Sequence, residues 1–191
     1  CSGTLSTSAC LVATTTLAFS WESGASDLAY FNLDANGTVS TTSALSFSVT
    51  GTDETTYTFN VAAVDTRGNV SATSTQAVDI YTRPVVINEI AWAGTAASFA
   101  DEWVELYNRT GRDISLSNFV VYTADMTPYI PLSGTISAGG YFLIERTDDN
   151  TVSTITADLV ARFSGSSGFG LGNGGESLVL SSASSTIDTV A

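Results

Sequence analysis

Apolar and polar residues alternate one by one in short runs along the first half of the chain. Such runs cover residues 17–21, 28–33, 45–50, 57–63 and 77–81. Turn-forming sequences separate them, for example Asp34-Ala35-Asn36-Gly37. A period of two places every second side chain on the same face of an extended chain, so the pattern predicts half-buried β-strands. Helical spacing of apolar residues is almost absent.

The second half shows the same rhythm after the break Thr82-Arg83-Pro84. Proline cannot donate a hydrogen bond to a central strand ladder, so this tripeptide marks a domain boundary. A new strand is predicted at residues 85–90. Strands with one apolar face require two sheets that share a core. The sequence therefore predicts an all-β chain of two tandem β-sandwiches, residues 1–82 and 83–191.

The first half resembles a fibronectin type III domain over residues 10–82. The resemblance depends on Trp21 in an early strand and on the run of residues 57–65, which leads into Gly68-Asn69-Val70-Ser71. It implies that Trp21 fills the core and that Tyr57 anchors a corner of the sandwich through its hydroxyl. Residues 51–54 depart from the family, which usually has a Leu-x-Pro-Gly turn there.

The second half carries a series of short blocks in a fixed order. They are residues 86–90, 101–108, 113–119, 130–136, 138–146, 175–180 and 186–190. These blocks resemble the lamin tail domain, an immunoglobulin-like sandwich that also occurs in secreted bacterial proteins. The resemblance implies a non-enzymatic module in which Glu89, Trp103 and Glu105 are structural, the two carboxylates accepting hydrogen bonds from backbone or Arg. Phe119 stands where bacterial relatives usually carry Trp, which changes packing rather than chemistry.

Composition excludes several kinds of chemistry. The chain has no His and no Lys, and its only cations are six Arg against 19 acidic residues, for a net charge of -13. Triads and zinc sites that need His are therefore absent, as are Schiff bases and phosphate-binding loops that need Lys. The acidity disfavours nucleic acid as a partner. The 26 Ser and 28 Thr suit an extracellular or cell-surface β-protein. A bacterial source is what the resemblance to the lamin tail domain implies.

The two cysteines offer one redox pair. Eight residues lie between Cys1 and Cys10, so an intramolecular disulfide would close a small loop, and an intermolecular one is an alternative. Cys1-Ser2-Gly3 also resembles the start of a processed bacterial lipoprotein, in which the first Cys carries lipid; an arbitrary fragment start is the other interpretation. No stretch approaches the ~18 apolar residues of a membrane span.

Several carboxylates are candidates for catalysis or for metal binding. Glu102 and Glu105 are three residues apart, which places them on opposite faces of a strand rather than flanking one cleft as a glycosidase requires. No catalytic residue is therefore predicted. Asp148, Asp149 and Asn150 form a turn whose oxygens suit Ca²⁺, which makes calcium the one candidate cofactor; a solvated turn is the alternative.

Two other motifs are weak. Residues 170–175 formally match the dinucleotide-binding pattern G-x-G-x-x-G, but a strand rather than a helix is expected after them, so a hairpin connection is favoured. Asn36, Asn69 and Asn108 each begin an N-x-[ST] sequence, which chance explains in a chain so rich in Ser and Thr.

These observations favour a non-enzymatic extracellular structural or adhesive protein. We expect a self-assembling subunit of a bacterial surface filament or layer, whose copies join by adding strands at open sheet edges. Aromatic residues keep a second role open, as a platform for glycan or for another surface protein; these are Trp92, Tyr107, Tyr122, Tyr129 and Tyr141. A third alternative is an accessory domain pair of a larger secreted enzyme.

Overall fold

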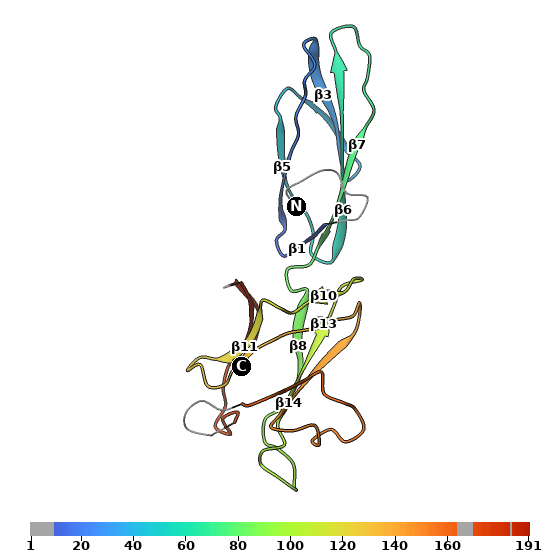
Figure 1. Ribbon diagram of the computed structural model, residues 1–191. Coiled ribbons are helices and arrows are strands. Elements are labelled where there is room, and N and C mark those ends of the chain that lie inside the picture. The colour runs from blue at the N-terminus through green and yellow to red at the C-terminus, as the bar shows by residue number, and fades with distance from the viewer. Residues whose placement is uncertain (1–9, 164–169, 184) are drawn as a thin grey trace. The chain divides into compact units, whose positions relative to one another are not determined.

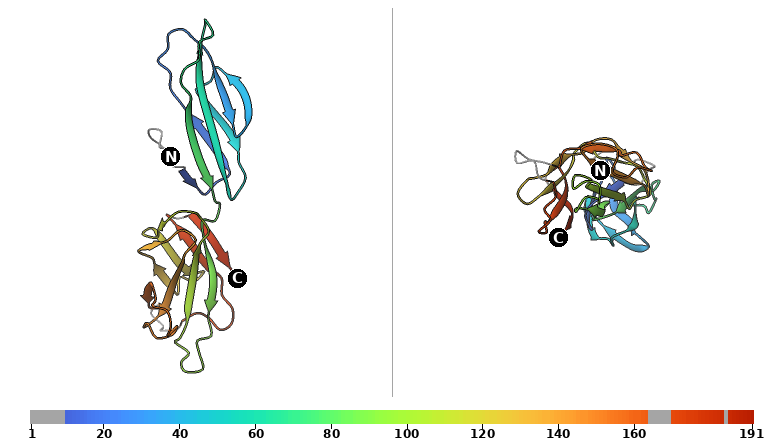
Figure 2. Two further views of the ribbon diagram at one scale, coloured as in Figure 1. Left: turned by 90° about the vertical axis from the view of Figure 1, so that its right-hand side faces the viewer. Right: turned by 90° about the horizontal axis from the view of Figure 1, so that it is seen from below.

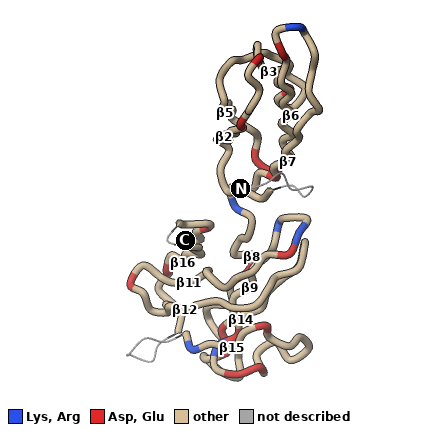
Figure 3. The backbone as a smooth tube through the Cα atoms, turned by 45° about the horizontal axis from the view of Figure 1, so that its top comes forward, with Lys and Arg blue, Asp and Glu red and all other residues tan. Residues whose placement is uncertain are grey.

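The computed structural model describes residues 10–163, 170–183 and 185–191 (Figure 1). Within these ranges all regular structure is β-strand, which confirms the predicted all-β class of immunoglobulin-like sandwiches. The chain divides into two compact units, Cys1–Thr82 and Arg83–Ala191. We refer to them as the first unit and the second unit. Acidic residues recur along both units, whereas cations are few (Figure 3).

The first unit packs a five-stranded sheet against a two-stranded one. Its strands are β1 (Cys10–Val12), β2 (Thr16–Ser20), β3 (Leu28–Ala35), β4 (Thr38–Thr42), β5 (Ser46–Thr50), β6 (Thr55–Asp65) and β7 (Ser74–Ile80). The larger sheet has the order β1-β7-β6-β3-β4, and β2 pairs with β5 in the smaller one. Figure 2 shows the long strands of the larger sheet side by side. Strand β4 therefore ends this sheet on one side.

An aromatic cluster around Phe59 forms the core of the first unit. Phe59 is 3% exposed, and its ring centroid lies 4.4 Å from that of Phe19 in a stacked arrangement. Trp21 and Phe47 lie 5.6 and 5.7 Å from the same ring, so side chains of both sheets meet on Phe59. Trp21 also contacts Phe31 edge-on at 5.6 Å. Such ring pairs add to the free energy gained from apolar burial.

The hairpin between β3 and β4 has the turn that its sequence predicts. Asn36 and Gly37 adopt φ values of 52° and 88°, the left-handed conformation that a two-residue hairpin of matching twist needs. The Gly37 N–H donates to Asp34 Oδ1 at 2.7 Å, which fixes the turn. The register of β4 on β3 is thereby set, with Val39 opposite Asp34.

The second unit is a sandwich of two four-stranded sheets with a short accessory ladder. Its strands are β8 (Val85–Ala91), β9 (Trp103–Asn108), β10 (Ile114–Ser115), β11 (Phe119–Thr123), β12 (Tyr129–Pro131), β13 (Thr135–Ile136), β14 (Tyr141–Arg146), β15 (Leu159–Ala161), β16 (Leu178–Ser182) and β17 (Ser185–Val190). The sheets have the orders β15-β14-β9-β8 and β12-β11-β16-β17, and β10 pairs with β13. The core includes Val104, Leu106, Ile144, Phe163 and Leu180, each 0% exposed. Phe119 packs against this core.

We expect the Phe59→Ala variant to lower the free energy of unfolding of the first unit by about 3–5 kcal/mol, because the substitution leaves a cavity where both sheets meet. Urea unfolding followed by tryptophan fluorescence measures the loss, since Trp21 contacts Phe59. Tyr30, which is 40% exposed, provides the control: Tyr30→Ala should change the same free energy by less than about 1 kcal/mol. Equal losses in the two variants would contradict the assignment of the core.

Candidate functional site

One carboxylate joins the two sheets of the second unit along an open side. Asp188 of β17 is 6% exposed, and its Oδ2 accepts the Ile87 N–H of β8 at 2.9 Å. Its Oδ1 accepts Arg83 Nη1 at 3.0 Å. β8 and β17 are the end strands of their two sheets. We call this arrangement the Asp188 clasp; it gives a backbone donor at a sheet edge the acceptor that a further strand would otherwise supply.

A β-bulge in β8 shapes the space beside the Asp188 clasp. In the pairing of β8 with β9, Asn88 is skipped between Ile87 and Glu89. Residues three apart on a regular strand face opposite sides, but one extra residue brings Ile87 and Ile90 to the same side. Both of these side chains pack against the core.

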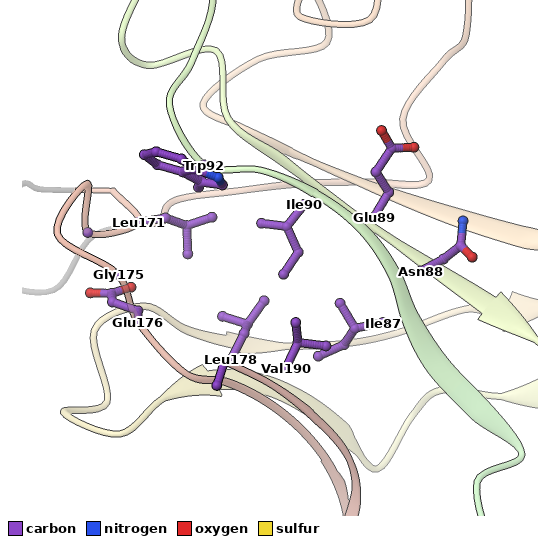
Figure 4. Close-up of a pocket in the computed structure, with 12 residues that line it drawn as sticks. Ile87, Asn88, Glu89, Ile90, Trp92, Leu171, Gly175, Glu176, Leu178 and Val190 are labelled. Carbon is purple, nitrogen blue, oxygen red and sulfur yellow. The ribbon is translucent and has the colours of Figure 1, made fainter.

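An apolar groove opens between β8, β17 and the segment before β16. Its cavity volume is about 480 Å³. Ile87, Ile90, Leu171, Leu178 and Val190 converge on it, and Trp92 stands over one side (Figure 4). We call it the β8–β17 groove. The carboxylates of Glu89 and Glu176 lie on its rim and point away from its apolar centre (Figure 4).

A buried ion pair holds the wall that Leu171 contributes. Arg146 Nη1 lies 3.2 Å from Glu102 Oε2, and the two side chains are only 8% and 5% exposed. The same Oε2 accepts the Leu171 N–H at 2.9 Å. The Phe99 ring lies 5.9 Å from the Arg146 guanidinium carbon, in cation–π contact. Glu102 therefore anchors a segment 69 residues further along the chain.

The surroundings of Glu102 shift its pKa, and they leave little space for a side chain at residue 170. Burial raises the pKa of Glu102, and the charge of Glu176 acts in the same direction, while the Leu171 N–H and Arg146 lower it. A Cβ on Gly170 would collide with the Glu102 carboxylate and the Arg146 guanidinium, so any larger residue there requires this ion pair to shift. The groove and its surroundings can hold an apolar or a cationic group. The buried carboxylate of Glu102 is already bonded to Arg146 and to the Leu171 N–H.

Comparison with known families identifies the sandwich that carries these features. A model of the Lamin Tail Domain family matches residues 79–191, more than half of the chain. The chain belongs to the lamin tail domain family. The resemblance predicted for the second half is thereby confirmed, and the second unit is the lamin tail domain of this protein. No curated protein matches the sequence.

Solved structures show only distant likenesses. A DUF4876 family protein from Bacteroides thetaiotaomicron is 13% identical over 74% of this chain and 51% of its own, with a TM-score of 0.31. A chitinase from Bacillus thuringiensis is 15% identical over 72% of this chain and 24% of its own, with a TM-score of 0.31. A biofilm associated protein, in its BSP domain, is 14% identical over 95% of this chain and 27% of its own, with a TM-score of 0.26. The chain thus spans about half of the first protein and about a quarter of the others, and likenesses this distant carry no argument about function.

The predicted structural residues of the lamin tail domain lie on the outer side of β8 and β9. Trp103 and Glu105 alternate with buried Val104 and are half-buried. Glu105 accepts a hydrogen bond from Asn88 Nδ2 at 2.7 Å, from an amide donor that the sequence did not indicate. Glu89 is exposed and stands opposite Glu105 in the strand register. Glu102 faces inward, as expected for a residue three positions from Glu105.

The candidate calcium turn forms a network of hydrogen bonds with its own loop. Asn150 Nδ2 donates to Asp148 Oδ1 at 2.8 Å, and the Ala157 N–H donates to Asp149 Oδ1 at 2.8 Å. Buried Glu145 accepts the N–H groups of residues 151 and 152 in the same loop. Across the described residues, no group of three or more His, Cys, Asp or Glu side chains is placed to hold a metal ion. Calcium binding at this turn stays a prediction.

Cys10 is disulfide-bonded. Cys1, its predicted partner, lies outside the described residues, so the pairing and the lipid on Cys1 stay predictions. In the part of the chain that the structure describes, no helix is long and apolar enough to cross a membrane.

Tyr57, the residue expected at a corner of the first unit, is 6% exposed and stacks on Phe19 with a centroid distance of 6.1 Å. Burial and the charge of Asp34 raise the pKa of Tyr57.

The five aromatic residues that the sequence offers as a binding platform do not form one surface. Tyr107 and Tyr141 pair on the β9–β14 sheet with a centroid distance of 4.9 Å. Tyr122 and Tyr129 pair on the other sheet at 6.3 Å. Trp92 lines the β8–β17 groove. The aromatic groups therefore form two tyrosine pairs on different sheets and one groove wall.

Two of the weak motifs gain structural explanations. The glycine-rich residues 170–175 lead into strand β16, so no helix N-terminus is available for a phosphate. Asn108 is 0% exposed, and its Nδ2 donates to the carbonyls of Arg112, Ile136 and Ser137. Its Oδ1 accepts both the N–H and the hydroxyl of Thr110. The folded domain therefore cannot present this asparagine for glycosylation.

The sequence did not reveal the residues that build the site. Asp188, Arg146 and Leu171 each act through a partner 44 or more positions away: Ile87 is 101 residues from Asp188, and Glu102 is 44 and 69 residues from Arg146 and Leu171. One local signal for this site is Asp188, a single acid in an otherwise uncharged strand. A buried carboxylate without a partner is costly, so such a residue implies a hydrogen-bond donor nearby.

We expect Asp188→Ala to lower the free energy of unfolding of the lamin tail domain by about 1–3 kcal/mol, because the buried Ile87 N–H loses its acceptor. Asp188→Asn keeps a carbonyl oxygen of the same shape and should lose less. Urea unfolding of the full chain, with hydrogen exchange to assign each transition to its unit, measures both variants. Equal losses for Ala and Asn would contradict the importance of the Ile87 hydrogen bond.

The raised pKa of Glu102 predicts a specific pH dependence. Its ordinary value is 4.5, and the folded value is higher, so the folded chain binds this proton more tightly than the unfolded chain. The contribution of Glu102 to the free energy of unfolding is therefore greatest below pH 4.5 and falls as the pH rises through the raised pKa. The difference between wild type and Glu102→Gln, measured from pH 4 to pH 7, should move in favour of the variant.

The exposed Glu22 provides the control for the substitution itself: Glu22→Gln makes the same chemical change outside the core and should change the free energy of unfolding at pH 7 by less than about 0.5 kcal/mol. A wild type that gains stability over Glu102→Gln as the pH rises would mean that Arg146, rather than burial, dominates the energetics of Glu102.

Proposed function

We propose that this protein is a non-enzymatic extracellular structural or adhesive protein of a bacterial surface, and that its copies associate through strand β4 of the first unit. The observation that carries the proposal is the unprotected edge of β4. Thr38–Thr42 contains no charged residue and no proline, and four of its five residues are exposed. Val39 is 76% exposed. Its register on β3 contains no bulge. An unbulged, uncharged edge rich in β-branched residues is a template for pairing with another chain.

The end strands of the lamin tail domain differ from β4, because each has a feature that hinders pairing with another chain. β8 is bulged at Asn88, and β17 is bulged opposite Leu180 and Ser181 and carries the inward-facing Asp188. β12 ends in Pro131, and β15 has only three residues. Bulges, inward charges, proline and short length are devices by which proteins prevent edge-to-edge pairing. In the described residues β4 has none of them, which supports it as the edge used for association.

Other features support the remaining parts of the proposal. A disulfide on Cys10 suits an oxidising compartment outside the cytosol. If β2 to β7 are taken as the strands B, C, C′, E, F and G, then B and E form one sheet and C, F and G the other. That division is typical of immunoglobulin-like and fibronectin type III sandwiches. We accordingly propose that residues 1–82 are a fibronectin type III-like domain and that residues 83–191 complete the pair.

A second candidate function is glycan binding, which the tyrosine pair Tyr122–Tyr129 favours. Tyr129 is 50% exposed, and the two rings border a hollow of about 390 Å³ together with Ser117 and Asn118. A hollow with aromatic faces and a few polar groups suits a neutral small ligand. Saturable glycan binding by a monomer, abolished by Tyr129→Ala, would favour this function over self-association.

We expect the full chain to form oligomers or filaments in size-exclusion chromatography with light scattering and in negative-stain microscopy. The double variant Val39→Lys with Thr41→Lys places two charges on β4 and should leave monomers. Ile155→Lys is the matched control, because Ile155 is 59% exposed but lies in a loop. A wild type that is monomeric at all concentrations, or a double variant that assembles like wild type, would overturn the proposal.

A further inference from the structure

The β8–β17 groove has no occupant among the described residues, although five apolar side chains converge on it (Figure 4). Its volume of about 480 Å³ lies in the range of ligand-binding pockets. Trp92, on its wall, is 50% exposed, and Val190 is 37% exposed. The groove can therefore bury a large apolar side chain that comes from outside the chain.

A second hollow adjoins the groove and is acidic. It has a volume of about 370 Å³ and shares Leu171, Gly172 and Glu176 with the groove. The carboxylates of Glu102, Asp125 and Glu176 line it against a single guanidinium, Arg146. Hydrogen bonds from Thr123 and from the Thr127 N–H hold the pKa of Asp125 below its usual range, so this carboxylate is charged at neutral pH. An occupant that reaches from the groove into this hollow needs a positive charge there.

The course of β8 along the groove suits an extended occupant. β8 and β17 are both end strands of their sheets, and the Asp188 clasp occupies the edge of β8 at Ile87. Beyond the clasp, β8 continues along the groove to its end at Ala91, next to Trp92. Because the bulge at Asn88 protects this edge from a further strand, the occupant is held by its side chains. In an extended segment side chains i and i+2 point to the same face, about 7 Å apart, so one enters the groove and the next reaches toward the acidic hollow.

We propose that the β8–β17 groove docks an extended segment of a partner protein in which a large apolar residue stands two positions from a Lys or Arg. Charge decides between this partner and a second copy of the chain. The chain has a net charge of -13, contains no Lys and has only six Arg, so a second copy is repelled by the acidic hollow. A basic segment is attracted to it. The proposal is independent of the self-association at β4, which lies in the other unit.

The probe that tests the proposal is a set of synthetic peptides, Ac-Thr-Thr-X-Thr-Z-Thr-Thr-NH₂, in which X and Z vary over all natural residues. Arrayed peptides are incubated with the full chain, and the strongest are measured by fluorescence polarisation. Binding should concentrate where X is Leu, Ile, Phe or Met and Z is Lys or Arg. Exchange of Z from Lys to Glu should weaken binding by about tenfold or more, and exchange of X from Leu to Ser by about tenfold.

Variants of the protein separate the groove from the acidic hollow. Glu176→Gln should weaken the binding of the peptide with Lys at Z by about fivefold, and should leave the binding of the peptide with Gln at Z unchanged. Trp92→Ser should weaken both peptides, because Trp92 contributes to the apolar wall without being buried in the core. Glu22→Gln makes the same change of charge in the first unit and should alter neither. Salt at 0.5 M should weaken the Lys peptide selectively.

Three results would overturn the proposal: no peptide that binds below about 1 mM, binding without preference for Lys or Arg at Z, or equal binding by wild type, Trp92→Ser and Glu176→Gln. Light scattering of the same variants tests the second copy as occupant. Loss of self-association in Trp92→Ser, with β4 intact, would assign the groove to a copy of the chain and would also overturn the basic partner. Monomeric protein that still binds the Lys peptide would instead contradict only the function proposed for β4.

Discussion

The lamin tail domain depends on Asp188 to close the open side of its sandwich. Its two main sheets end in β8 and β17, and the side chain of Asp188 links the two strands by accepting the Ile87 N–H. A sandwich is otherwise held on such a side only by apolar packing, and the backbone donors of an end strand face solvent. Because the carboxylate also points inward, it makes β17 a poor template for a further strand. The same residue therefore closes the fold and protects an edge.

The buried carboxylates of this domain all accept hydrogen bonds from backbone N–H groups. Glu102 accepts the N–H of Leu171, Glu145 accepts those of Thr151 and Val152, and Asp188 accepts that of Ile87. Glu102 and Asp188 also pair with an Arg, Arg146 and Arg83 respectively. The backbone N–H groups are the donors common to all three carboxylates, and each such bond ties a loop or an edge to the core.

The sequence predicted what depends on local rhythm. The alternation at Leu17 and Phe19 corresponds to β2, which ends one residue before Trp21, and the Asn36-Gly37 turn corresponds to the β3–β4 hairpin. It did not predict the bulge at Asn88, because one extra residue leaves no mark in an alternating pattern until its pairing with β9 is known. For the same reason it gave no indication that Ile87 and Ile90 share a face. The roles of Asp188 and Arg146 depend on partners far along the chain, and the partner of Glu105 proved to be an amide.

The two surfaces of this protein differ in the range of the forces that they use. Strand β4 has no charge, so a contact there depends on backbone hydrogen bonds that act only at short range. The rim of the β8–β17 groove and its neighbouring hollow carry carboxylates, whose attraction for a cation extends over a Debye length of about 8–10 Å. A net charge of -13 opposes the approach of like copies and favours the approach of a basic partner. The association proposed at β4 therefore uses an edge without charge, whereas the acidic groove is proposed to select its partner by charge before its apolar centre makes contact.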